Sequence, residues 1–228
     1  MKNKKNNKKN NIKLISKKTD FKKSFNWKVL KIMGEFIKGF EFISEIKGKS
    51  ATIFGGTRFS SKDFIYKEAE KLGKSLSKQG YIIVTGGGQG VMEAANKGAY
   101  EAGGKSIGIN ISLPREQVLN KYVNKSENFH YFFIRKTMLS MASSIYIFFP
   151  GGFGTLDEFF EMLVLVQTKK LSRPVIIIAV GKEYWQPLFD WFLKDFYKKY
   201  HTINKEDLEI FKIVDTAEEA ISLLKSLT

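Results

Sequence analysis

The sequence predicts an α/β fold in which helices flank a doubly wound parallel sheet of about six strands. From residue 49 onward, short β-branched and aromatic runs alternate with segments whose apolar residues repeat at helical spacing. Three of the apolar runs end in glycine-rich turns, which is typical of strands that pass directly into helices. This rhythm favours parallel strands joined by right-handed crossovers, and 228 residues with 43% hydrophobic side chains suffice for one such domain.

The alternation gives an expected position for each element along the chain. The expected strands cover residues 51–55, 81–85, 106–111, 144–149 and 174–180, with a weaker strand near 210–214. The expected helices cover residues 62–79, 90–103, 133–143, 155–168, 184–199 and 216–226. The segment 112–131 shows neither period and is expected to form an irregular loop over one edge of the sheet.

A tail of residues 1–20 precedes the expected single domain of residues 21–228, which combines an N-terminal helix at 26–46 with a core at 49–228. The Lys/Asn-rich tail is expected to be disordered, since it has too little apolar surface to offset the entropy of ordering. Of the formal net charge of +15, eight lysines within residues 1–18 supply +8 and leave +7 for the rest. A solubilising tail is favoured over a nucleic-acid-binding arm, because no aromatic residue interleaves these lysines.

The N-terminal helix is expected to be amphipathic. Its apolar stripe contains Leu30, Met33, Ile37 and Phe40, which repeat at intervals of three and four residues, and is widened by Val29, Phe36 and Ile43. A stripe of this kind packs on the protein's own core or on a second subunit more often than it lies on a membrane. We therefore expect one of the first two arrangements and no membrane partner.

The composition argues against several classes of protein. The chain contains no cysteine, so disulfides, thiolate catalysis and Cys-ligated metals are excluded. Its two histidines, His130 and His201, are far apart in sequence, so no metal site is expected. No apolar stretch approaches the ~20 residues of a membrane span, and the basic N-terminus lacks the apolar segment of an export signal. The expected location is therefore the cytoplasm.

Three glycine-rich turns are expected to converge on one edge of the sheet. Residues 150–158 follow one apolar run, 86–90 follow another, and Gly55-Gly56 follows a third. Because the carboxyl ends of parallel strands meet at one edge, these turns predict a ligand site there. At residues 150–158 a strand passes directly into a helix. The free N–H groups and the dipole at the start of that helix favour binding of a phosphate. Since Glu158 would lie one turn inside this anion site, its carboxylate is expected to serve another part of the same ligand.

Two common nucleotide motifs do not fit these turns. The dinucleotide fingerprint needs a third glycine where Val91 stands and an acidic residue near Asn110. A P-loop needs Gly-Lys-Ser/Thr at the end of a glycine run, and neither run ends in that way. A dehydrogenase and a P-loop NTPase are therefore not favoured.

Three motifs together resemble those of a known family. They are Gly86 to Asn96 (GGGQGVMEAAN), Phe133 to Lys136 (FIRK) and Pro150 to Glu158 (PGGFGTLDE, of the form PGGxGTxxE). With them the chain resembles the Lonely Guy (LOG) family of Rossmann-like proteins, whose members often carry the label "possible lysine decarboxylase". The resemblance spans about residues 26–220. Because it includes the leading helix and Tyr184-Trp185, the chain resembles the longer-chain branch of the family.

The resemblance implies nucleoside 5′-monophosphate phosphoribohydrolase activity. AMP or a cytokinin riboside 5′-monophosphate, which is an N6-modified AMP, would give free base and ribose 5-phosphate. The implied catalytic pair is Arg135 and Glu158, and no cofactor is implied. This chemistry is consistent with the residue types, since a carboxylate stabilises the oxocarbenium character of the ribose and an arginine counters charge on the departing base.

The same resemblance suggests further substrate contacts and a homodimer or larger homo-oligomer. The suggested substrate-binding residues are Thr57, Arg58, Gly87, Gly88, Gly90, Met92, Glu93, Asn96, Lys136, Gly151, Gly152, Gly154 and Thr155. Gly152, Gly154 and Thr155 would hold the 5′-phosphate.

Alternative interpretations remain open at several of these residues. Arg135 is also typical of an ion-paired or solvated helix residue, and Met92 of a core residue. Thr155 and Glu158 have the spacing of a helix capping box, which would occupy the same carboxylate. A protein that binds a nucleotide or a molybdopterin-type cofactor without cleaving it is the alternative function. Pyridoxal-dependent decarboxylation is not supported, since Lys136 has no identifiable partner for the cofactor ring.

Overall fold

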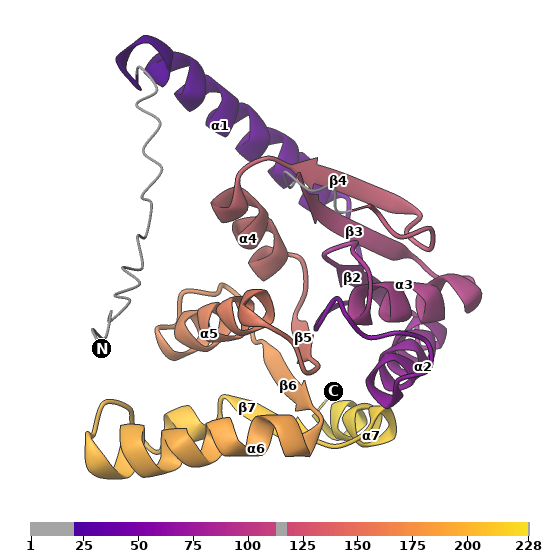
Figure 1. Cartoon of the computed structure of the whole chain (residues 1–228), viewed down its shortest axis with the longest axis vertical. Helices are drawn as coiled ribbons and strands as arrows, with labels where there is room; N and C mark the ends of the chain where they lie inside the picture. Colours follow the sequence, from indigo (N-terminus) through magenta and orange to yellow (C-terminus); the bar gives the residue numbers. More distant parts are fainter. Residues whose placement is uncertain (1–20, 113–117, 228) are drawn as a thin grey trace, which may run out of the picture.

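A seven-stranded parallel sheet forms the centre of the computed structural model, which describes residues 21–112 and 118–227 (Figure 1). The strand order is β4-β3-β2-β1-β5-β6-β7, and every neighbouring pair is parallel. The order therefore reverses between β1 and β5, and a doubly wound sheet opens a crevice at such a point. The strands are β1 Ser50–Phe54, β2 Ile82–Thr85, β3 Ser106–Ile111, β4 Lys125–Phe129, β5 Ile145–Phe148, β6 Ile176–Val180 and β7 Phe211–Val214.

Helices cover both faces of the sheet, so the sheet has a separate apolar core on each side (Figure 1). Helices α2, α3 and α7 pack on one face, and α1, α4, α5 and α6 pack on the other. The α-helices are α1 Phe21–Ser44, α2 Phe64–Lys78, α3 Val91–Glu101, α4 Phe132–Met141, α5 Phe153–Gln167, α6 Lys182–Trp191 and α7 Ala217–Leu227. A π-helix, η1 Phe192–Lys199, continues α6, and a 3₁₀ turn, η2 Glu206–Glu209, precedes β7. The arrangement confirms the predicted α/β class.

The expected loop at 112–131 is wrong for residues 125–129. These residues form β4, which pairs with β3 in the register Ile107↔Lys125 and lies at the edge of the sheet. Of its five residues only Phe129 is buried, since the sequence is Lys-Ser-Glu-Asn-Phe. An edge strand needs little apolar surface, so this strand lacks the hydrophobic pattern that predicts a strand.

The predicted stripe of α1 is exposed along its centre, whereas Phe36 and Ile43, which widen it, are partly buried against the core. Leu30, Met33, Ile37 and Phe40 are each at least 45% exposed. Phe42 is buried in the core on this face of the sheet. No helix within the described ranges is both long and apolar enough to cross a membrane. The predicted tail at 1–20 lies outside the described residues.

Candidate active site

A cavity of about 250 Å³ lies beside the carboxyl ends of β1 and β5, where the strand order reverses. Its position matches the crevice that a doubly wound sheet provides for a ligand. The lining residues come from the end of β1, from three loops and from α3, α4 and α5: Phe54, Gly55, Gly56, Thr57, Gly86, Met92, Phe132, Arg135, Gly152, Gly154, Thr155, Asp157 and Glu158.

One end of the cavity is formed by the first turn of α5. Gly152 is the N-cap, and its carbonyl accepts the N–H groups of Thr155 and Leu156 at 3.0 and 3.1 Å. Within the described chain, the amides of Phe153 and Gly154 donate to no protein acceptor. A Cβ at Gly154 would meet no atom within 4 Å, so the backbone there is open to a ligand. This end of the cavity can therefore receive an anion.

Glu158 projects from the second turn of α5 into the same cavity. Its side chain is only 6% exposed. Because the helix N-cap is Gly152, and α5 has no side-chain cap hydrogen bond, the alternative capping box between Thr155 and Glu158 is not formed. Burial, with repulsion from Glu161 and Asp157, raises the pKa of Glu158 to about 8, although Arg135 and Lys136 oppose the rise.

Arg135 enters the cavity from the first turn of α4. Its Nε–H donates to the carbonyl of Ile109, in β3, at 2.8 Å. Its guanidinium lies directly against the backbone of Gly86, where a Cβ would overlap it. Burial lowers the pKa of Arg135, and attraction to Glu158 opposes this effect.

Arg135 and Glu158 line the same cavity without bonding to each other. No hydrogen bond or ion pair joins the two side chains, both of which belong to the described chain. A direct ion pair would occupy both groups with each other. Space between them therefore leaves each group free to act on a ligand, and the arrangement places opposite charges around one small volume.

Lys136 lies outside the cavity and joins α4 to α5. Its Nζ is 2.8 Å from Asp157 Oδ1 and 3.2 Å from Glu161 Oε2. It is therefore not placed to contact a ligand in the cavity, but its charge acts on Glu158.

The second glycine turn is held by buried polar side chains. Asn96 is fully buried; its Oδ1 accepts from Thr85 and Asn120 at 2.6 and 3.0 Å, and its Nδ2 donates to Ser106 at 2.8 Å. Asn120 also donates to the carbonyls of Gly87 and Gly88. Asn96 therefore supports the loop at residues 86–90 and does not line the cavity.

The predicted site residues divide into two groups. Seven of them line the cavity: Thr57, Met92, Arg135, Gly152, Gly154, Thr155 and Glu158. Eight others lie near it without lining it: Arg58, Gly87, Gly88, Gly90, Glu93, Asn96, Lys136 and Gly151. Some of the eight support the loops, since Gly90 has a φ of 68° and a Cβ there would overlap the carbonyl of Gly56.

Six other lining residues are not among the predicted substrate contacts, although the sequence predicts a ligand site at the turns of Gly55-Gly56 and 86–90. They are Phe54, Gly55, Gly56, Gly86, Phe132 and Asp157. The glycines stand in turns that the sequence had marked, so the signal for them was present. Nothing in the sequence distinguished Phe132 or the supporting Asn120.

Comparisons with known proteins point to one family. A family model described as "Possible lysine decarboxylase" matches residues 92–224. Arabidopsis thaliana LOG3, named a cytokinin riboside 5′-monophosphate phosphoribohydrolase, is 27% identical over 192 residues, which cover 83% of this chain and 87% of that protein. The probable phosphoribohydrolase LOG4 of Oryza sativa subsp. japonica is 26% identical over 178 residues, with 77% and 76% covered.

The extent of the match varies among relatives. The probable phosphoribohydrolase LOGL5 of Oryza sativa subsp. japonica is 29% identical over 135 residues, so the match spans 58% of this chain and about half, 54%, of that protein.

Solved structures share the fold. The molybdenum cofactor binding protein of Rippkaea orientalis superposes with a TM-score of 0.61 at 22% identity, covering 79% of this chain and 98% of that one. The molybdenum cofactor carrier protein of Chlamydomonas reinhardtii gives a TM-score of 0.59 at 22% identity, with the same coverage. With the family model matching more than half of its length, the chain belongs to the family described as possible lysine decarboxylase, which is the LOG family that its motifs resemble.

Proposed function

We propose that this protein hydrolyses the N-glycosidic bond of a nucleoside 5′-monophosphate, AMP or a cytokinin riboside 5′-monophosphate. The products are the free base and ribose 5-phosphate. The observation that carries the proposal is the buried carboxylate of Glu158 opposite the guanidinium of Arg135, in one cavity that ends at a helix N-terminus. The names of the related proteins support the same reaction class.

The phosphate is assigned to the start of α5. The free amides of Phe153 and Gly154 and the hydroxyl of Thr155 supply donors, and the helix dipole adds favourable potential. Gly152 and Gly154 carry no side chain, so the phosphate can approach the backbone closely. A phosphate bound at this position fixes the 5′ end of the ribose. Glu158, about one helical turn further along α5, then faces the sugar.

Glu158 acts on the ribose and on water. As the bond between C1′ and the base nitrogen breaks, positive charge builds on the ribose, and a carboxylate stabilises it. A water oxygen then bonds to C1′ as one water proton passes to Glu158, the electron pair of the broken bond stays on the base nitrogen, and that nitrogen takes a proton from solvent, to which Glu158 later returns its own. A pKa of about 8 makes the ionised Glu158 a stronger base than an ordinary carboxylate.

Arg135 acts on the departing base. Its guanidinium is held by the carbonyl of Ile109 and lies against Gly86, so its donors have a fixed direction. Phe54, Met92 and Phe132 give the cavity an apolar wall that suits the flat face of a base. Charge that develops on the base is thereby countered next to a surface that binds its ring.

The alternative is a protein that binds a nucleotide or a molybdopterin-type cofactor without cleaving it. The similar solved structures support only the fold at their level of identity. A buried carboxylate inside an anion-binding cavity disfavours binding of an anion, so Glu158 favours hydrolysis over simple storage. A ligand that copurifies with the protein, identified by mass spectrometry, together with no turnover, would favour the alternative.

We infer that the exposed stripe of α1 contacts a second copy of the chain in a homodimer or larger assembly. Leu30 and Ile37 are each 60% exposed, and Phe153, at the start of α5, is 92% exposed. Exposed apolar residues of this extent are typical of an interface. Light scattering coupled to gel filtration tests the inference: the protein should elute as an oligomer, and Ile37→Glu should shift it toward the monomer.

Comparison of AMP with adenosine tests the reaction and the phosphate site together. Chromatography of the reaction mixture should show adenine and ribose 5-phosphate from AMP. Adenosine should be cleaved far more slowly, because it cannot use the amides of α5. Equal rates with the two compounds would contradict the assignment of the phosphate to the start of α5. Absence of adenine from the AMP reaction would contradict the proposed hydrolysis.

A further inference from the structure

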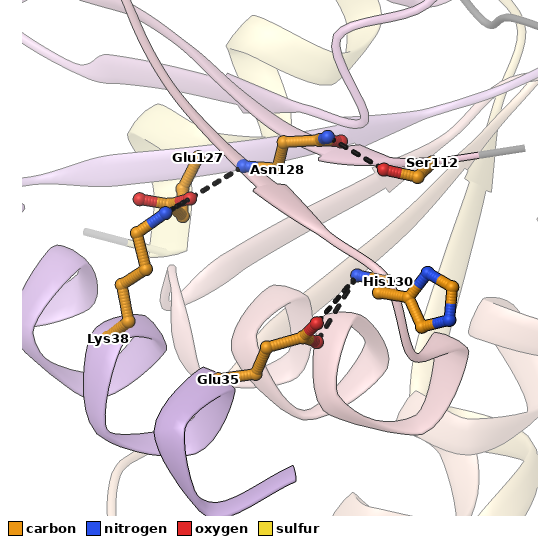
Figure 2. A network of polar contacts seen from close by, with 6 residues as sticks. All are labelled: Glu35, Lys38, Ser112, Glu127, Asn128 and His130. Carbon is orange, nitrogen blue, oxygen red and sulfur yellow. Dashed lines mark hydrogen bonds and ion pairs between the residues drawn. The ribbon is translucent and has the colours of Figure 1, made fainter. Parts of the chain in front are cut away.

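The helix that carries Arg135 begins at a cap supplied by another helix. Tyr131 is the N-cap residue of α4, and its own side chain makes no cap hydrogen bond. The carboxylate of Glu35, in α1, accepts the N–H of His130 at 3.1 and 3.2 Å and the N–H of Tyr131 at 3.2 Å. Figure 2 shows Glu35 reaching from α1 to the backbone of His130. Glu35 therefore satisfies amides that precede the first turn of α4.

The opposite end of α4 also receives a charged side chain from elsewhere. Arg173, in the connection between α5 and β6, donates from Nη2 to the carbonyls of Met141 and Ser143 at 2.5 and 2.7 Å. A carboxylate lies at the N-terminus and a guanidinium at the C-terminus, which is the arrangement that the helix dipole favours. Both ends of α4 are thus fixed by partners distant in sequence.

Helix α1 is itself closely fitted against α4 and β4 (Figure 1). A Cβ at Gly39 would lie 2.7 Å from Met138 Sδ, so the two helices meet at a glycine. Lys38 binds Glu127 of β4 at 2.6 Å, and Figure 2 shows this ion pair on the same side of α1 as Glu35. Contacts one turn further along α1, at Lys38 and Gly39, therefore fix the part of the helix that carries Glu35.

A short hydrogen-bonded path leads from Glu35 to Arg135. Glu35 accepts the N–H of Tyr131, and the carbonyl of Tyr131 accepts the N–H of Arg135 at 3.2 Å. The side chain of Arg135 then donates to Ile109 at 2.8 Å. Arg135 is thus held at two points: its backbone N–H is bonded to Tyr131 at the start of α4, and its side chain is bonded to Ile109 in β3.

We propose that Glu35 is a positioning residue that fixes the first turn of α4 and, through it, the direction of the Arg135 guanidinium. Its kinetic consequence rests on the proposed function, whereas its effect on Arg135 does not. Displacing a group by about 1 Å from its working position costs an enzyme up to about 100-fold in rate. Loss of the Glu35 cap therefore reduces activity without removing any group from the cavity.

A set of variants tests this role kinetically. Glu35→Ala should lower kcat/KM for AMP by about 10-fold to 100-fold. Glu35→Gln keeps an oxygen acceptor and should lie between Glu35→Ala and the unchanged protein, which keeps the test open if Glu35→Ala folds poorly. Glu41→Ala is the matched control, since Glu41 is exposed on the same helix, and it should not change kcat/KM.

A double variant separates positioning from general damage. If Glu35 acts through Arg135, then adding Glu35→Ala to Arg135→Ala should cause no further loss of the residual activity. Losses that multiply would overturn the proposal, because they would show that Glu35 acts independently of the arginine.

A measurement on Arg135 itself needs no turnover. The Nε–H resonance of Arg135, identified by its loss in Arg135→Lys, should exchange slowly with solvent because it is bonded to Ile109. Exchange should become faster in Glu35→Ala and stay unchanged in Glu41→Ala. Equal exchange in all three proteins would overturn the proposal. Failure of the unaltered protein to release adenine from AMP would instead refute the proposed function, and the exchange rate would still decide the role of Glu35.

Discussion

Lys136 Nζ lies 2.8 Å from Asp157 Oδ1, so the residue after the candidate catalytic arginine is bound to the residue before the candidate catalytic glutamate. The same ammonium group lies 3.2 Å from Glu161 Oε2, one turn further along α5. This contact joins α4 and α5 beside the cavity. It also places a positive charge where it influences ionisation of Glu158 without filling the space that a substrate would need.

The activity should rise with pH through a pKa of about 8. Burial raises the pKa of Glu158 to about 8, and the proposed reaction needs the ionised carboxylate. We expect kcat/KM for AMP to increase tenfold per pH unit below about 8 and to level off above it, which initial rates between pH 7 and 9.5 would measure. This range avoids the second ionisation of the phosphate near pH ~6. A constant or falling kcat/KM over the range contradicts this role for Glu158.

Neutralising Lys136 or Glu161 should move this profile in opposite directions. Lys136→Met removes a positive charge that lowers the pKa of Glu158, so the rising limb should shift to higher pH. Glu161→Gln removes a negative charge that raises this pKa, so the limb should shift to lower pH. Rates measured across the same pH series check both variants. Shifts of the same sign would show that Glu158 does not control the profile.

Gly86→Ala should impair catalysis through Arg135. A Cβ at Gly86 would overlap the guanidinium of Arg135 and lie 2.8 Å from Met92 Sδ, so the arginine must move. We expect kcat/KM for AMP to fall by about 10-fold or more while the protein stays folded. Gly34→Ala is the matched control: a Cβ there meets nothing within 4 Å, so the activity should be unchanged and the stability raised by about 0.5–1 kcal/mol. Full activity of Gly86→Ala would show that Arg135 is not needed in its present position.

Glu158→Gln should stabilise the fold, and the gain should grow with pH. The folded-state pKa of about 8 exceeds the ordinary value of 4.5, so the folded protein holds more protons than the unfolded chain between these values. Its stability therefore falls as the pH rises through this window. Glutamine does not ionise, so we expect a gain in unfolding free energy of about 1–3 kcal/mol at pH 9 and a smaller gain at pH 5. Denaturant unfolding at the two pH values measures this; an equal or larger gain at pH 5 would mean that Glu158 is not held at a raised pKa.

The fold could be predicted from the sequence where strands are buried on both faces. The run at 144–149 and the run at 174–180 are continuous and apolar because helices cover both sides of the central strands. The edge strand β4 could not be found in this way, since Lys125, Ser126 and Glu127 face solvent or surface partners. Backbone pairing with β3 makes this segment a strand. Such pairing does not require apolar and polar side chains to alternate along the sequence.

The site could be predicted where chemistry and chain geometry coincide. Gly152, Gly154 and Thr155 could be predicted to lie beside a cavity, because glycines between a strand and a helix are typical of an anion site. The supporting contacts could not be predicted: Glu35 binds amides 95 and 96 residues away, and a single glutamate on an amphipathic helix carries no signal for such a partner. The motif predicts a ligand contact for Asn96, yet packing directs its amide into the core.

Release of adenine from AMP by the unaltered protein and by Glu158→Gln tests the central claim most directly. Glutamine has nearly the same size and cannot ionise, so it preserves the shape of the cavity while removing the carboxylate. We expect steady release of adenine with equal ribose 5-phosphate by the unaltered protein, and a rate at least about 100-fold lower for the folded variant. Equal rates for the two proteins, or no adenine from either, would contradict the account.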